Sequence, residues 1–362
     1  MKTPLLGLSL PELAQAIAPV APERFRAKQL LRWIVERRAS GFAAMTDLPA
    51  PVRAALDERF AIGLPEVEAR TAAEDGAEKF LFRLADGAKV EAVHIPAPRR
   101  RGGGGGERVT VCVSSQAGCA VNCAFCVTGR LGAGRNLTAG EILGQYLVVA
   151  RERRFGPREA NVVFMGMGEP LLNVANVSRA LDLLEEEVSP KRTTVSTAGV
   201  VPGIRELAKR ERRPNLAVSL TAAGNALRTR LMPINAQWPV ADLFEALAEW
   251  PLEPGRRITF EVVLIAGVND GPEEARALAR LVRRLPSKVN LIPLNESREW
   301  LPDLRRPTDA AVDAFAGLLA GSGVDVTVRR SKGLGAAAAC GQLKGREIPG
   351  RIARIPSPNV RS

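Results

Sequence analysis

The chain contains five cysteines, and three of them lie in one short segment. Cys119, Cys123 and Cys126 have the spacing C-x3-C-x2-C, which supplies three thiolates close together and no fourth. A structural zinc site normally takes four ligands, commonly as two C-x2-C pairs. An iron–sulfur cluster held by three cysteines instead leaves one iron open for a small molecule. The spacing therefore favours a [4Fe–4S] cluster on these three residues, with zinc or buried free thiols as the alternatives.

The other two cysteines lie at separate places in the chain. Cys112 is just upstream, in CVSSQAGC, and Cys340 is far downstream, in the small-residue stretch AAAACGQL. A lone cysteine on an apolar strand is usually a small core residue. Both nevertheless fall next to the expected site, and two thiols that meet can form and break a disulfide or a mixed adduct. We therefore predict that this pair takes part in chemistry.

From about residue 108 the sequence alternates between expected strands and amphipathic helices, which predicts parallel strands. The expected fold is α/β, a barrel or part of one, here a partial (βα)6 barrel. In such barrels the functional residues lie at the carboxyl ends of the strands. The expected strands are VTVCV (109–113), NVVFM (161–165), RTTVS (192–196), NLAVSL (215–220), ITFEVVLI (258–265) and KVNLIPL (288–294), with VDVTVRR (324–330) coming late.

Polar and glycine-rich segments follow these strands, so they are expected on one rim of the barrel. In strand order they are the cysteine segment, GMGEP (166–170), STAG (196–199), Ser219 with Thr221, and Asn295. Glycines let the backbone approach a ligand closely. Glu169 is placed to accept hydrogen bonds from a ligand's amino group, although GMGEP alone also suits an ordinary tight turn.

The remaining sequence predicts four regions. Residues 1–75 read as a helical N-terminal accessory domain that binds RNA. Residues 76–107 read as a β-hairpin, KFLFRL and KVEAVHIP around Asp86-Gly87, followed by a Gly-rich linker. Residues 108–345 form the barrel core, and residues 346–362 form a basic tail.

Charge and cysteine usage point to a partner and a compartment. The net charge is +12, from 51 basic and 39 acidic residues, which favours a polyanionic partner such as nucleic acid over many separate solvated helix faces. Aromatic residues make up 4% of the sequence, so stacking of aromatic side chains on bases is not expected to be the main contact with nucleic acid. We expect a cytoplasmic protein without membrane spans, because no apolar run is long enough and odd, clustered cysteines do not suit a secreted disulfide framework.

With these motifs the chain resembles the RlmN/Cfr family of radical S-adenosylmethionine (SAM) RNA methyltransferases, and RlmN within it. The resemblance runs in family order from about residue 25 to 343. It rests on FRAKQLLRWI, MTDLP, CVSSQAGCAVNCAFC, NVVFMGMGEPLLN, STAGVVP, MPIN, VND, NLIPLN and ACGQL.

The resemblance implies a mechanism that uses two SAM molecules per turnover. One SAM methylates Cys340, and the second is cleaved to a radical that takes hydrogen from this S-methyl group. The methylene radical adds to adenine C2, Glu91 removes the adenine proton, and Cys112 attacks the Cys340 sulfur, which releases the product and leaves a transient disulfide. The implied substrates are adenosine 2503 in the peptidyl-transferase centre of 23S rRNA and adenosine 37 of tRNAs.

The resemblance also implies ligand contacts and partners. An electron donor such as flavodoxin or ferredoxin is expected, and the protein is expected to be a monomer. Methylation at C8, as in the Cfr branch, a diverged paralogue acting on another RNA, and a non-catalytic RNA-binding protein with a structural metal stay open as alternatives. The implied SAM contacts are Gly168, Glu169, Ser196, Ser219, Leu220, Thr221 and Asn295.

Overall fold

The computed structural model describes residues 2–96, 109–157, 159–329 and 333–345. The predicted Gly-rich linker and the basic tail at 346–362 lie outside the described residues. The helices are α1 (Leu10–Ile17), α2 (Arg24–Val35), α3 (Ala50–Arg59), α4 (Val127–Arg130), α5 (Ala139–Arg153), α6 (Val174–Leu184), α7 (Val201–Ala208), α8 (Asn225–Leu231), α9 (Val240–Ala248), α10 (Pro272–Val282) and α11 (Asp309–Gly321). The strands are β1 (Thr3–Pro4), β2 (Phe60–Ala61), β3 (Glu66–Ala72), β4 (Glu78–Arg83), β5 (Lys89–Pro96), β6 (Val109–Cys112), β7 (Gln116–Ala117), β8 (Arg135–Asn136), β9 (Ala160–Phe164), β10 (Thr193–Thr197), β11 (Asn215–Ser219), β12 (Ile258–Leu264), β13 (Ser287–Pro293) and β14 (Val326–Val328).

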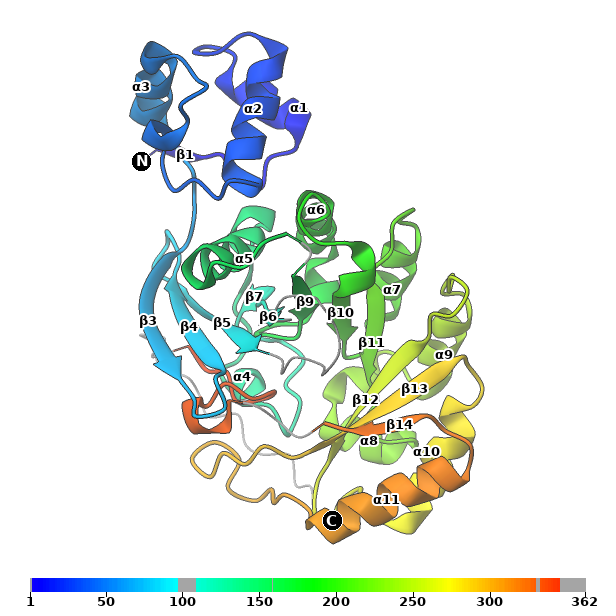
Figure 1. Cartoon of the computed structure of the whole chain (residues 1–362). Coiled ribbons are helices and arrows are strands. Elements are labelled where there is room, and N and C mark those ends of the chain that lie inside the picture. The colour runs from blue at the N-terminus through cyan, green and yellow to red at the C-terminus, as the bar shows by residue number, and fades with distance from the viewer. Residues whose placement is uncertain (1, 97–108, 158, 330–332, 346–362) are drawn as a thin grey trace, which may run out of the picture.

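One sheet of ten strands forms the centre of the fold. Its strand order is β14-β13-β12-β11-β10-β9-β6-β5-β4-β3. The strands from β6 to β14 in this sheet pair in parallel, which confirms the predicted partial barrel of six βα units with a short seventh strand. Helices cover the outside of the curved sheet (Figure 1). The carboxyl ends of these strands therefore meet on one rim.

The predicted hairpin is β4 and β5, and it joins the barrel sheet because β5 pairs antiparallel with β6. One difference from the expectation concerns residues 66–72, which were placed in the helical region. They form β3, which pairs antiparallel with β4 and makes a three-stranded extension of the barrel sheet. The helical part of the accessory region thus ends at Arg59.

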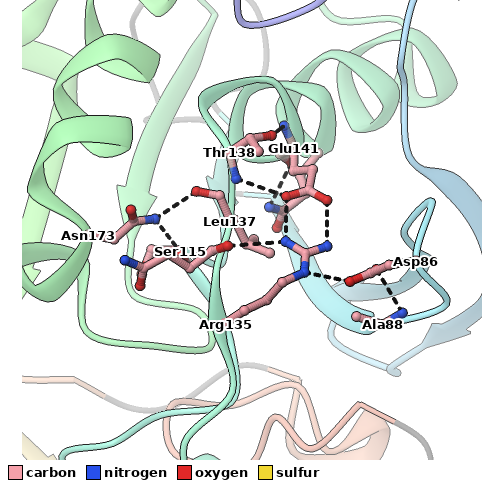
Figure 2. Close-up of polar contacts among 10 residues, drawn as sticks. Asp86, Ala88, Ser115, Arg135, Leu137, Thr138, Glu141 and Asn173 are labelled. Carbon is pink, nitrogen blue, oxygen red and sulfur yellow. Dashed lines mark hydrogen bonds and ion pairs between the residues drawn. The ribbon is translucent and has the colours of Figure 1, made fainter. Parts of the chain in front are cut away.

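A capping box starts α5. The Thr138 hydroxyl accepts a hydrogen bond from the Glu141 amide (3.2 Å), and the Glu141 carboxylate accepts one from the Thr138 amide (2.8 Å). The same carboxylate binds both terminal nitrogens of Arg135, which also reaches Asp86 in the β4–β5 turn (Figure 2). Nearby, Asn173 donates to the carbonyls of Ser115 and Leu137. These contacts fasten the hairpin to the start of the barrel.

The helices α1 to α3 sit beside α5 and α6, at one end of the molecule (Figure 1). Arg38, just after α2, forms a buried ion pair with Glu187 and donates to the carbonyl of Phe155. Tyr146 on α5 also donates to Glu187 (3.2 Å). The accessory helices are therefore joined to the barrel by buried polar contacts. In the described part of the chain, no helix is both long and apolar enough to span a bilayer.

Candidate active site

A cavity lies at the carboxyl ends of the parallel strands, as the barrel rule predicts. Its wall brings together residues that are far apart in the sequence, from the loops after β6, β9, β10, β11 and β13 and from the C-terminal segment. The predicted site residues that line it are Cys119, Cys123, Cys126, Gly168, Glu169, Ser196, Ser219, Asn295 and Cys340.

The three clustered cysteines share one buried space. Burial raises the pKa of the Cys119 thiol to about 12 and that of Cys123 well above its ordinary value, and in both cases Cys126 adds to the shift. Binding of a metal would displace these thiol protons. Within the described residues, no three His, Cys, Asp or Glu side chains have the arrangement of a single-ion site. A cubane cluster binds its ligands at separate corners, so three thiols around one space suit a cluster.

Glu169 is fixed deep in the wall beside these cysteines. Its carboxylate accepts hydrogen bonds from the amides of Leu171 (2.9 Å) and Ala198 (2.6 Å), while burial raises its pKa to about 7. Gly168 has φ +100°, and a Cβ there would lie 2.7 Å from the backbone nitrogen of Gln116, so this position needs glycine. The turn thus presents a carboxylate with free lone pairs to the cavity.

The segment 333–345 closes one side of the cavity and is held at several points. The Asn295 side chain donates to the Cys340 carbonyl (2.9 Å), and the amide of Val127 donates to the Gly341 carbonyl (2.8 Å). Thr128 donates to the carbonyl of Leu343 (2.6 Å). Because α4 follows directly after the last clustered cysteine, the Cys340 segment and the cysteine loop support each other.

Cys112 and Cys340 lie close enough for their charges to interact, and both are free thiols. Cys112 ends β6 and is buried behind the cavity wall, and burial raises its pKa to about 12, with a further contribution from Cys340. The guanidinium of Arg329 opposes this shift. The same two cysteines and Glu261 raise the pKa of Arg329, which lines the cavity. One guanidinium therefore interacts electrostatically with both Cys340 and Cys112.

Glu91 lies next to the cavity but does not line it. Its side chain is 2% exposed, forms an ion pair with Lys79 (3.2 Å) and accepts a hydrogen bond from the Lys344 amide (2.9 Å). The Cys340 segment therefore covers Glu91. Leu220 and Thr221 are also buried without lining the cavity, so their roles as SAM contacts stay predictions. Thr221 has φ +59°, a strained conformation for a β-branched residue.

Comparison with known proteins decides the family. Residues 3–62 match the model of the ribosomal RNA large subunit methyltransferase N-terminal domain, and residues 113–281 match the radical SAM superfamily. The chain is 43% identical to the dual-specificity RNA methyltransferase RlmN of Syntrophotalea carbinolica, covering 94% of this chain and 90% of the relative. The corresponding protein of Geobacter sulfurreducens is 44% identical, with coverage of 94% and 91%. The chain belongs to the RlmN family of radical SAM RNA methyltransferases. A crystal structure of a radical SAM methyltransferase from Sphaerobacter thermophilus superposes with a TM-score of 0.87 at 40% identity, covering 95% of this chain and 100% of that one.

Membership of the RlmN family implies an iron–sulfur cluster and SAM, and the residues present fit both. Cys119, Cys123 and Cys126 would supply the thiols for the cluster. Two buried acceptors of the cavity-lining residues have no donor in the described part of the chain, Asn295 Oδ1 and Glu261 Oε2. SAM carries an ammonium group and ribose hydroxyls, which are donors of the kind these oxygens lack.

Sequence reasoning missed four charged residues around this RlmN-family site. Glu261 and Arg329 line the cavity, whereas Arg130 and Arg228 are buried behind it. Two of them carried a readable signal, because Glu261 is an acid inside the apolar run ITFEVVLI and Arg329 follows directly after the last strand. Arg130 and Arg228 lie in ordinary polar helix sequence and gave none.

Proposed function

We propose that this protein methylates C2 of adenosine, at adenosine 2503 of 23S rRNA and adenosine 37 of tRNAs, using Cys340 as the methyl carrier. The proposal is supported chiefly by one observation: Cys340 lines the same cavity as the three clustered cysteines and Glu169, with the buried thiol of Cys112 beside it. The relatives' description as dual-specificity RNA methyltransferases supports RNA as the substrate.

When bound, the cluster and SAM supply one-electron cleavage of a carbon–sulfur bond and hydrogen-atom abstraction. The protein's own part begins with Cys340, whose thiol accepts a methyl group and presents it at the cavity wall. Asn295 holds the backbone of Cys340 through its carbonyl (2.9 Å). Glu169 accepts the ammonium group of SAM and orients it. Radical chemistry is needed because C2 of adenine is not nucleophilic and therefore cannot attack the methyl group of SAM in an ordinary polar methyl transfer.

The remaining two roles belong to Glu91 and Cys112. Glu91 removes the C2 proton once the methylene carbon is bonded to the base, and Lys79 holds this carboxylate in place. Once the adduct has given up its unpaired electron, which the oxidised cluster would accept, Cys112 attacks the Cys340 sulfur. The carbon–sulfur bond breaks, its electron pair stays on the methylene carbon, which takes up a proton to become the methyl group, and a disulfide forms that a cellular reductant must reduce. Burial raises the pKa of Cys112, and the positive charge of Arg329 partly offsets this rise, which favours the thiolate that attacks.

In this proposal the accessory helices α1 to α3 bind the RNA. Helix α2, RFRAKQLLRWIV, carries four basic residues, and Phe25 at its start is 54% exposed. The match to a ribosomal RNA methyltransferase N-terminal domain covers this helix. An expected cytoplasmic location and a flavodoxin- or ferredoxin-like electron donor complete the proposal.

The test is anaerobic reconstitution with iron and sulfide, followed by incubation with SAM, reductant and unmodified 23S rRNA or tRNA, and nucleoside mass spectrometry. Wild type should yield 2-methyladenosine. Cys340→Ala should yield none while still cleaving SAM, which shows that its cluster is intact, and Cys112→Ala should accumulate a covalent protein–RNA adduct. Formation of 8-methyladenosine, or methylation that survives in Cys340→Ala, would contradict the proposal.

A further inference from the structure

Two arginines are buried beside the cysteine loop and form no ion pair with a carboxylate among the described residues. Arg228 on α8 is 0% exposed, and its guanidinium donates to three backbone carbonyls and to the side chain of Asn235 (2.7 Å). Arg130 ends α4 and is 6% exposed. It donates through Nη2 to the carbonyl of Ala124 (3.1 Å), and its Nε and Nη1 have no acceptor in the described chain.

A buried guanidinium without an anion is costly, because its charge loses the solvation of water and gains no partner. Burial accordingly lowers the pKa of Arg228 to about 10 and lowers that of Arg130. The ionisable groups that act in the opposite direction are cluster cysteines, Cys123 for Arg228, and Cys126 with Cys123 for Arg130. The structure places both arginines against the cysteine loop: Arg130 donates to the carbonyl of Ala124 in this loop, and the Ala124 amide donates to the carbonyl of Leu231 (2.8 Å) at the end of α8, the helix that carries Arg228.

Neither arginine can form a direct ion pair with RNA or with the carboxylate of SAM, so an anion that interacts with them has to act through the wall of the cavity. Neither guanidinium lines the cavity in which SAM would bind, where the lining arginine is Arg329. Arg228 is also inaccessible from the surface. The group that would occupy the space between the cysteines is the cluster, whose inorganic sulfides and thiolates carry net negative charge.

We propose that Arg130 and Arg228 are the counter-charges of the iron–sulfur cluster and raise its reduction potential. The inference rests on the cluster that the proposed function assigns to the cysteine loop. Reduction makes a cluster one unit more negative, so a fixed buried cation stabilises the reduced form more than the oxidised form. In this way both arginines make the electron transfer that starts the reaction easier.

The experiment compares reconstituted wild type with Arg130→Gln, Arg130→Lys and Arg228→Gln. A control, Arg212→Gln, removes an equal charge from a side chain that is 61% exposed and paired with Glu185. Iron and sulfide per chain are measured first. The fraction of reduced cluster is then followed by electron paramagnetic resonance across a series of fixed potentials, without substrate.

At a given potential, Arg130→Gln and Arg228→Gln should each lower the ratio of reduced to oxidised cluster about tenfold, which is a shift of about 59 mV toward negative potential. Arg130→Lys should stay near wild type because it keeps the charge, and Arg212→Gln should be unchanged. If Arg228→Gln fails to fold, the ratio of reduced to oxidised cluster in Arg130→Gln still tests the inference. Wild-type ratios in Arg130→Gln at full iron content would overturn the inference and leave the proposed function intact. Wild type that binds zinc or no iron would overturn both.

Discussion

Arg135 is the residue whose removal should loosen the hairpin that carries Glu91, and the size of this effect can be worked out from its contacts. The guanidinium binds Glu141 through two hydrogen bonds (2.8 and 2.7 Å) and Asp86 through a third (2.6 Å), as Figure 2 shows. Glu141 belongs to the capping box of α5, and Asp86 lies in the β4–β5 turn. Arg135→Ala therefore removes the side-chain link between the β4–β5 turn and α5, while the pairing of β5 with β6 and the cavity stay intact.

The contact of Arg135 with Asp86 and its contact with Glu141 contribute unequally to the free energy of unfolding. The hydrogen bond from Arg135 is the main reason that the pKa of Asp86 falls to about 2 from its ordinary value of 3.8. Full conversion of this shift would give about 2.5 kcal/mol, but Asp86 is 47% exposed, so solvent screening reduces it to about 1 kcal/mol or less. The Glu141 half is less exposed and bidentate, and it adds about 1–2 kcal/mol. Arg135→Ala should thus destabilise the protein by about 1–3 kcal/mol.

The assay is a double-mutant cycle of Arg135→Ala and Asp86→Asn, read from urea unfolding and from hydrogen exchange of the hairpin amides. The coupling energy should be about 1 kcal/mol at pH 7. Because the folded-state pKa of Asp86 is lowered, this stabilisation is present above about pH 4 and is lost as the pH falls through about 2. The control Arg83→Ala removes an exposed ion pair between β4 of the hairpin and Glu66 on β3, and it should change neither readout. A coupling energy of zero, or equal hydrogen exchange in both variants, would refute the reasoning.

Four further outcomes follow from the site. Lys79→Met should lower the unfolding free energy by about 3 kcal/mol in chemical denaturation, since it leaves the Glu91 carboxylate buried without its cation; an unchanged midpoint would show that the pair is not formed. SAM affinity, measured by calorimetry, should fall about tenfold per pH unit below about pH 7 as Glu169 becomes protonated, and Glu169→Gln should bind weakly with a flat profile. Arg329→Met should slow methylation of Cys340 about tenfold by intact-protein mass spectrometry, a loss of about 1.4 kcal/mol of barrier stabilisation, while equal rates would exclude a role for the cation. RNA affinity should fall steeply with salt, and a flat response would contradict phosphate pairing.

The barrel and its rim could be predicted from the sequence because their signals are local. Each core strand is an apolar run of β-type residues, and the glycine and polar residues that follow it mark the same end of every strand. Strand β3 was not predicted for the opposite reason. Its sequence, EVEARTA, is polar with only weak alternation, and at the edge of the sheet its stability comes from pairing with β4, which local composition does not reveal.

The charged residues around the site show which contacts cannot be predicted from the local sequence. Lys79 and Glu91 lie on neighbouring strands, with Leu81 opposite Glu91 and Lys79 opposite Val93, so their pairing is a diagonal contact that only the strand register defines. Arg130 and Arg228 give no signal in the sequence, because nothing in a helical turn tells a solvated arginine from one that faces the core. Burial is decided by the loops that pack over these helices.

The same hydrogen bonds that position Cys340 also connect it to every other part of the site. Its carbonyl is held by Asn295, the next carbonyl by the first residue of α4, and the amide of Lys344 by Glu91. The methyl carrier, the cysteine loop and the proposed base are thus linked by one short segment. An adenine that must reach both Cys340 and Glu91 has to displace the contact between Lys344 and Glu91, since this contact covers the carboxylate. In the proposed mechanism we therefore expect entry of the substrate and exposure of the Glu91 carboxylate to be coupled.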